Sequence, residues 1–108
     1  MTNIEYAELL NYINEQSNKY NNVSIYRVHS SYNPNTNKIC KITLKINYTK
    51  DGSDLPNIVN GKLPKNVTER SVNFRSDNCN IEDVKEWLED FMSEKANRIV
   101  VGGKYIGY

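Results

Sequence analysis

The chain has 108 residues, a length that fits one domain with one hydrophobic core. Its formal net charge is only +1, and it contains 17 Asn and 8 Tyr against 2 Phe and 2 Met, which predicts a thin core with a tyrosine-rich margin. No apolar run approaches the roughly 20 residues that cross a bilayer. The first residues also lack the basic start of a signal peptide, so we expect a cytoplasmic protein with no membrane partner.

Residues 2–20 predict the first helix. Thr2 and Glu5 have the spacing of a capping box, in which each side chain bonds the backbone of the other residue. Apolar side chains then recur at helical spacing. They are Tyr6, Leu9, Leu10 and Ile13. We expect the helix to end at Asn21 and Asn22, because Asn favours turns over helix interiors.

Residues 23–31 and 39–49 predict two antiparallel strands joined by a turn around Pro34. The second strand has the clearest alternation in the chain. Its inward set is Cys40, Ile42, Leu44, Ile46 and Tyr48, and its outward set is Lys41, Thr43, Lys45 and Asn47. In the first strand both faces are partly apolar.

Residues 50–65 predict a long irregular loop, with turn signals at Asp51-Gly52 and Asn60-Gly61. Loops of about fifteen residues are uncommon in small domains and are often functional or mobile. Residues 67–75 predict a third strand with Phe74 inward and Arg75 outward. Residues 98–101 predict a short fourth strand, and the tail after it either adds an edge strand or frays.

Residues 80–97 predict the helix around which the chain is organised. Its apolar side chains form one stripe at 3.6 residues per turn. They are Ile81, Val84, Trp87, Leu88, Phe91 and Met92. Asn80 and Asp83 are placed to cap its first turn.

The expected fold is one α+β domain over residues 1–108, of order α-β-β-β-α-β, with two helices on one face of a mostly antiparallel sheet. The expected core comprises Leu10, Ile13, Ile42, Leu44, Ile46, Phe74, Val84, Trp87, Leu88 and Phe91. Cys40 and Cys79 are expected as buried reduced thiols.

Charge is divided along the chain. Residues 23–75 contain nine basic and three acidic residues, whereas residues 76–97 contain two basic and seven acidic residues. One candidate contact surface is therefore acidic and lies on the second helix: Glu82, Glu86, Glu89 and Asp90. The other is basic and lies on the sheet and long loop: Arg27, Lys41, Lys45, Lys62, Lys65 and Arg75. Two solvated faces of opposite charge would give the same pattern.

Catalytic and cofactor motifs are absent from the sequence. The single histidine, His29, has no nucleophile or acid motif around it, and no phosphate-binding or dinucleotide fingerprint occurs. Two separated cysteines and one histidine do not make a zinc site. We therefore expect a protein that is not an enzyme and holds neither a metal nor a cofactor.

The segments ITLKINYTKDG (42–52) and IEDVKEWLEDF (81–91), a strand end and the later helix, carry a family resemblance. In size, composition and element order, the chain resembles the small anti-CRISPR proteins of phages. This resemblance implies an inhibitor that occupies a surface of a host CRISPR-Cas effector. The resemblance assigns a function to no individual residue of this chain. The basic residues in the middle of the chain also distinguish it from the strongly acidic proteins of that group that mimic DNA.

Two functions therefore remain open from sequence. The first is a non-catalytic protein that inhibits a protein or protein–nucleic acid complex through the acidic helix. The alternative is a nucleic-acid-binding accessory protein that uses the basic sheet face and long loop, with Tyr26 or Tyr32 stacking on bases. A second copy of the chain is a further possible partner for the basic face.

Overall fold

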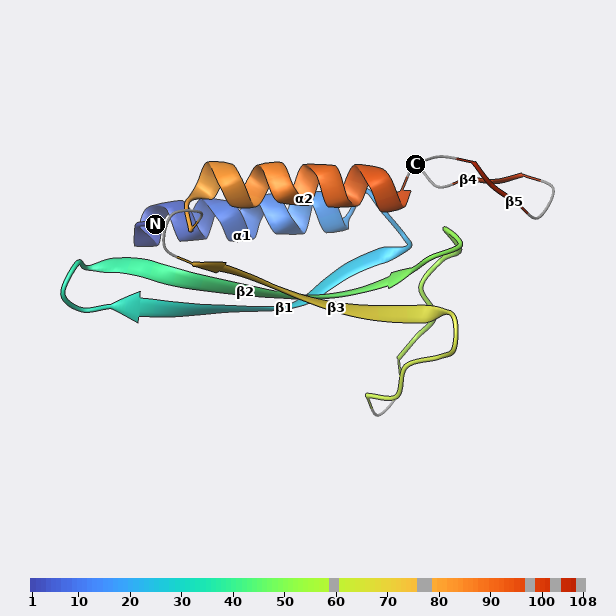
Figure 1. Cartoon of the computed structure of the whole chain (residues 1–108), viewed down its shortest axis with the longest axis horizontal. Coiled ribbons are helices and arrows are strands. Elements are labelled where there is room, and N and C mark those ends of the chain that lie inside the picture. Colours follow the sequence, from blue (N-terminus) through green and yellow to red (C-terminus); the bar gives the residue numbers. More distant parts are fainter. Residues whose placement is uncertain (59–60, 76–78, 97–98, 102–103, 107–108) are drawn as a thin grey trace.

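The computed structural model describes residues 1–58, 61–75, 79–96, 99–101 and 104–106. Its elements are α1 (Asn3–Ser17), β1 (Val23–Asn33), β2 (Lys38–Thr49), β3 (Val67–Arg75), α2 (Ile81–Ala96), β4 (Ile99–Val101) and β5 (Lys104–Ile106). Both long helices lie side by side on one face of a three-stranded antiparallel sheet (Figure 1). The expected α+β class and element order are confirmed.

Helix α1 begins at the capping box that the sequence predicts. The Thr2 hydroxyl accepts a hydrogen bond from the backbone N–H of Glu5 at 3.1 Å, and the Glu5 carboxylate accepts one from the N–H of Thr2 at 3.0 Å. The helix ends at Ser17, earlier than expected, with Asn18 as its C-cap. The placement of Leu10 in the core was wrong: Leu9 is fully buried, whereas Leu10 is 38% exposed. Both fit helical spacing, but the sheet covers only the side of α1 on which Leu9 lies.

The sheet has the order β1-β2-β3, so β2 is its central strand. Two register shifts interrupt the β1–β2 pairing, and they leave Tyr26 and Cys40 as the extra residues of β-bulges. The first bulge keeps Ile25 and Val28 on the helix-facing side, which explains why β1 lacks simple alternation. The second bulge keeps Ile39 and Ile42 on the helix-facing side and turns the side chain of Cys40 outward. The expectation that Cys40 is buried was therefore wrong, while Cys79 is buried as expected.

Asn80 caps the start of helix α2, since its side-chain oxygen accepts a hydrogen bond from the N–H of Asp83 at 2.9 Å. The Asp83 carboxylate in turn accepts from the Asn80 side-chain amide at 2.7 Å. Along the inner stripe of α2, Val84 and Leu88 are fully buried. Trp87 is half-buried and packs against the margin of the core, where it stacks on Phe91 at 5.0 Å between ring centroids.

The fourth strand of the sequence prediction forms outside the main sheet. Strand β4 pairs only with β5 in the described chain, as a separate two-stranded antiparallel hairpin. The expected helix end at Asn97, the strand start at Arg98 and the turn position Asn60 lie outside the described residues.

Candidate functional site

The sheet face opposite the helices is polar. Because outward residues alternate along each strand, the register identifies which side chains share this face. We call it the open face, formed by Arg27, His29 and Ser31 of β1, Lys41, Thr43 and Lys45 of β2, and Ser71, Asn73 and Arg75 of β3. Each of these side chains is exposed or half-buried, and no helix covers them (Figure 1).

Cations lie directly opposite cations on the open face. Arg27 pairs in register with Lys45, and Lys41 pairs with Arg75. Side chains at such positions are neighbours, and like charges there destabilise a sheet. Within the described part of the chain, Arg27, Lys41 and Lys45 have no ion-pair partner. This arrangement concentrates positive charge on the sheet face that the described helices leave uncovered.

A row of other polar side chains separates the two cation pairs. His29, Thr43 and Asn73 lie in one cross-strand row, and the Thr43 hydroxyl donates to the Asn73 side-chain oxygen at 2.6 Å. The structure thus brings four of the six predicted basic residues together. The other two, Lys62 and Lys65, are exposed on the loop after β2, which projects from the open-face side of the sheet (Figure 1).

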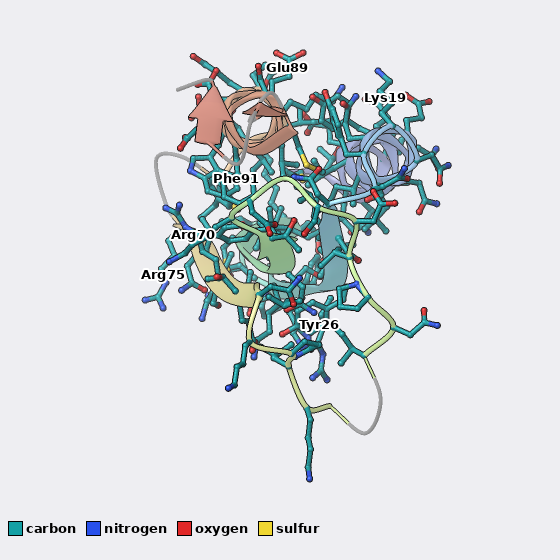
Figure 2. The ribbon with its side chains drawn as sticks, turned by 90° about the vertical axis from the view of Figure 1, so that its right-hand side faces the viewer. Lys19, Tyr26, Arg70, Arg75, Glu89 and Phe91 are labelled. Carbon is teal, nitrogen blue, oxygen red and sulfur yellow. The ribbon has the colours of Figure 1, made fainter. Side chains whose placement is uncertain are left out.

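The four predicted acidic residues also share one surface, which we call the acidic face. Glu82, Glu86, Glu89 and Asp90 are all exposed on α2. Figure 2 shows Glu89 on the side of α2 turned away from the sheet. The acidic face and the open face therefore lie on opposite sides of the molecule, with the core between them.

Hydrogen bonds to backbone carbonyls fix the first part of the loop after β2. The fully buried Thr49 donates through its hydroxyl to the Ser53 carbonyl at 2.5 Å. The N–H of Leu55 then donates to the carbonyl of Asn21 at 2.8 Å. These bonds attach residues 49–55 to the turn between α1 and β1, so the loop starts from an ordered base.

A cleft of about 560 Å³ lies between this loop and the end of the sheet. Its lining residues are Ser24, Tyr26, Asn47, Leu55, Pro56, Asn57, Ile58, Gly61, Leu63 and Glu69. Gly61 has a φ of 70°, in the left-handed region that favours glycine. We call this the loop cleft; it adjoins the open face, because Tyr26 precedes Arg27 and Asn47 follows Lys45 by two residues.

Two polar features characterise the loop cleft. The Tyr26 hydroxyl donates to the Glu69 carboxylate at 2.5 Å, and this bond raises the pKa of the tyrosine. Asn47 is only 7% exposed, and its side-chain oxygen has no hydrogen-bond partner among the described residues. Figure 2 shows Tyr26 on the side of the sheet away from the helices. Sequence reasoning missed Asn47 and Glu69, because only the fold of the loop brings them into a cavity.

Within the described residues, no group of three or more His, Cys, Asp or Glu side chains is placed to hold a metal ion. None of the described helices has the length and hydropathy needed to span a bilayer. Comparison with protein-family models, with curated proteins and with solved structures finds no match to this chain.

Proposed function

We propose that this chain is a non-catalytic binding protein whose open face contacts the phosphate backbone of a nucleic acid, free or within a protein–nucleic acid complex. The observation that supports it best is the presence of two cross-strand cation pairs in register, Arg27 with Lys45 and Lys41 with Arg75, on a sheet face that the described helices leave uncovered. A phosphate placed between Arg27 and Lys45 would reduce the repulsion between these two cations. Binding would also release counterions from the nucleic acid.

Single strands suit this surface better than duplexes. The loop projects from the same side as the open face and stands in the path of a straight double helix (Figure 1). Tyr26 is 45% exposed, which leaves its aromatic ring available for base stacking. Tyr32, the other tyrosine considered from sequence, pairs in register with the core residue Ile39 and so lies on the helix-facing side of the sheet. Sheets with exposed aromatic side chains bind single strands in this way in several domain classes.

Fluorescence anisotropy with a labelled single-stranded oligonucleotide tests this proposal. We expect binding that weakens linearly on a log–log plot against salt, with a slope set by the number of phosphates neutralised. The Arg27→Gln/Lys45→Gln double variant should lose affinity and flatten that slope by about 0.7 for each cation removed. Lys19→Gln, at an exposed position after α1, is the matched control and should bind as the parent does. Absence of binding at low salt and tens of micromolar protein would rule the proposal out.

The acidic face supports a second candidate, inhibition of a protein partner such as a host CRISPR-Cas effector. Four exposed carboxylates on one helix can dock on a nucleic-acid-binding surface and speed association through charge complementarity. Affinity capture from a bacterial lysate at low and moderate salt, followed by mass spectrometry, would identify such a partner. Glu86→Lys/Asp90→Lys should then slow association without unfolding the chain, since both residues are exposed; a partner indifferent to this reversal excludes the acidic face.

A further inference from the structure

The loop cleft has the size and wall chemistry of a small-ligand site. Its volume of about 560 Å³ lies within the range of roughly 300–1,000 Å³ typical of ligand pockets. Tyr26, Leu55, Pro56, Ile58 and Leu63 give it aromatic and apolar walls. A flat ring can be held between such walls by stacking and dispersion.

Two side chains of the cleft, Glu69 and Asn47, present oxygen atoms that can accept hydrogen bonds from a ligand. The Glu69 carboxylate accepts one hydrogen bond from Tyr26, and its two oxygens have room for further donors. The side-chain oxygen of Asn47 is buried and has no described partner, a state that costs free energy until a donor is supplied. No Lys or Arg is among the described residues that line the cleft. The oxygens of Glu69 and Asn47 therefore favour an occupant that contributes N–H groups.

The cations beside the cleft specify the rest of the ligand. Arg27 and Lys45 form one cross-strand pair on the open face, next to the lining residues Tyr26 and Asn47. Successive same-face residues of a strand are about 7 Å apart, so Lys45 lies one such step from Asn47. A ligand that fills both places carries a negative group at the cations and a donor-bearing ring at the cleft. A nucleotide has this pattern.

We propose that the loop cleft binds a guanine base of a single strand whose phosphates lie on the open face, an inference that rests on the proposed function. Guanine presents two adjacent donors on its Watson–Crick edge, N1–H and the N2 amino group, and these match the two oxygens of Glu69. Uracil has one such donor between two carbonyl oxygens, which the carboxylate repels. Proteins recognise unstacked bases of single strands through this edge.

An arginine side chain from a protein partner has the same two-donor pattern. It also adds a positive charge beside Arg27 and Lys45, which disfavours it here. A nucleotide instead places its negative charge at these cations. The observations therefore favour the base, and an arginine-containing peptide becomes a control in the test.

The test compares three labelled RNA strands of equal length by anisotropy: oligouridine, the same strand with one central guanosine, and the same strand with inosine there. Inosine lacks the N2 amino group but keeps N1–H. We expect the guanosine strand to bind about 5- to 100-fold more tightly than oligouridine, the range for a good two-point contact to a base. The inosine strand should lose most of that preference.

Two variants assign the preference to the cleft. Glu69→Gln should reduce the ratio of guanosine to uridine affinity to near one, since the amide offers a single acceptor oxygen. Leu63→Ser changes an exposed loop wall outside the core and should lower the same ratio, so the test does not depend on one variant folding. Circular dichroism checks the fold of each variant, and Lys19→Gln should keep the full ratio.

The possible failures are distinguishable. Equal binding of all three strands, or a guanosine preference untouched by both variants, overturns the cleft assignment and leaves the open-face function standing. Absence of binding to every strand overturns both. Saturable binding of an arginine-containing peptide that Glu69→Gln removes, without guanosine preference, shows that the cleft takes a protein side chain instead.

Discussion

Removal of one cation from the open face should make the protein more stable. Arg27 and Lys45 are directly opposite each other in register, and Lys45 is half-buried on the central strand. Two unit charges held about 6 Å apart in water repel by about 0.7 kcal/mol. This agrees with the range of roughly 0.2–1 kcal/mol for a cross-strand pair. Lys45→Gln keeps most of the side-chain length and removes the charge, so we expect a gain of about 0.3–0.7 kcal/mol at low salt.

Thermal melting followed by circular dichroism measures this gain. A domain of this size should melt about 1–5 °C higher for that change in free energy. In 1 M salt the screening length falls to about 3 Å, so the difference between variant and parent should largely disappear. Lys65→Gln, at an exposed loop position, is the matched control and should leave the melting temperature unchanged.

The reasoning would be refuted if Lys45→Gln melted at or below the parent temperature at low salt, or if its gain persisted in 1 M salt. The first result would mean that the opposed cations do not repel. The second would mean that the gain comes from packing or strand propensity and not from charge. Under our account the same variant binds a single strand more weakly, so stability and binding move in opposite directions.

The remaining predictions concern the core and its margins. Leu88→Ala should lower the free energy of unfolding by about 2–5 kcal/mol in urea titrations, whereas Leu10→Ala should cost well under half as much, because Leu88 is fully buried and Leu10 is 38% exposed. At pH 8 a thiol reagent should modify Cys40 rapidly and Cys79 only on unfolding, because burial shields Cys79 and raises the pKa of its thiol. Rapid modification of both cysteines in the folded protein would contradict this. The backbone and side-chain hydrogen bonds from Thr2 lower the pKa of Glu5, so its ionised form stabilises the fold near neutral pH. The stability difference between the parent and Glu5→Gln should therefore shrink as the pH falls below 4.5 in pH-dependent melts.

The parts of the fold that local patterns determine were predictable from sequence. The capping box of α1 requires only Thr2 and Glu5 at the right spacing, and the stripe of α2 requires only helical periodicity. Alternation in residues 41–46 identified the lysines of β2 that point outward. Once β1 and β3 pair with β2, the outward residues of all three strands form the open face. These features depend on neighbours within a few residues.

The features that sequence missed depend on distant contacts. A β-bulge shifts every side chain beyond it to the other face, and nothing local marks Cys40 as the extra residue. Leu9 and Leu10 fit the helix equally well until the sheet position is known. The loop cleft requires Leu55 to bond Asn21, 34 residues away in the chain, and so the lining role of Asn47 had no signal in its own segment.

The most direct test of the central claim is a titration of the isotope-labelled protein with a single-stranded oligonucleotide, followed by amide NMR shifts. Our account predicts saturable shifts in the open-face residues of β1, β2 and β3 and in the loop cleft, with little change along α2. These shifts should weaken together as salt is raised. Shifts confined to the acidic face of α2, or none at low salt and saturating oligonucleotide, would contradict it.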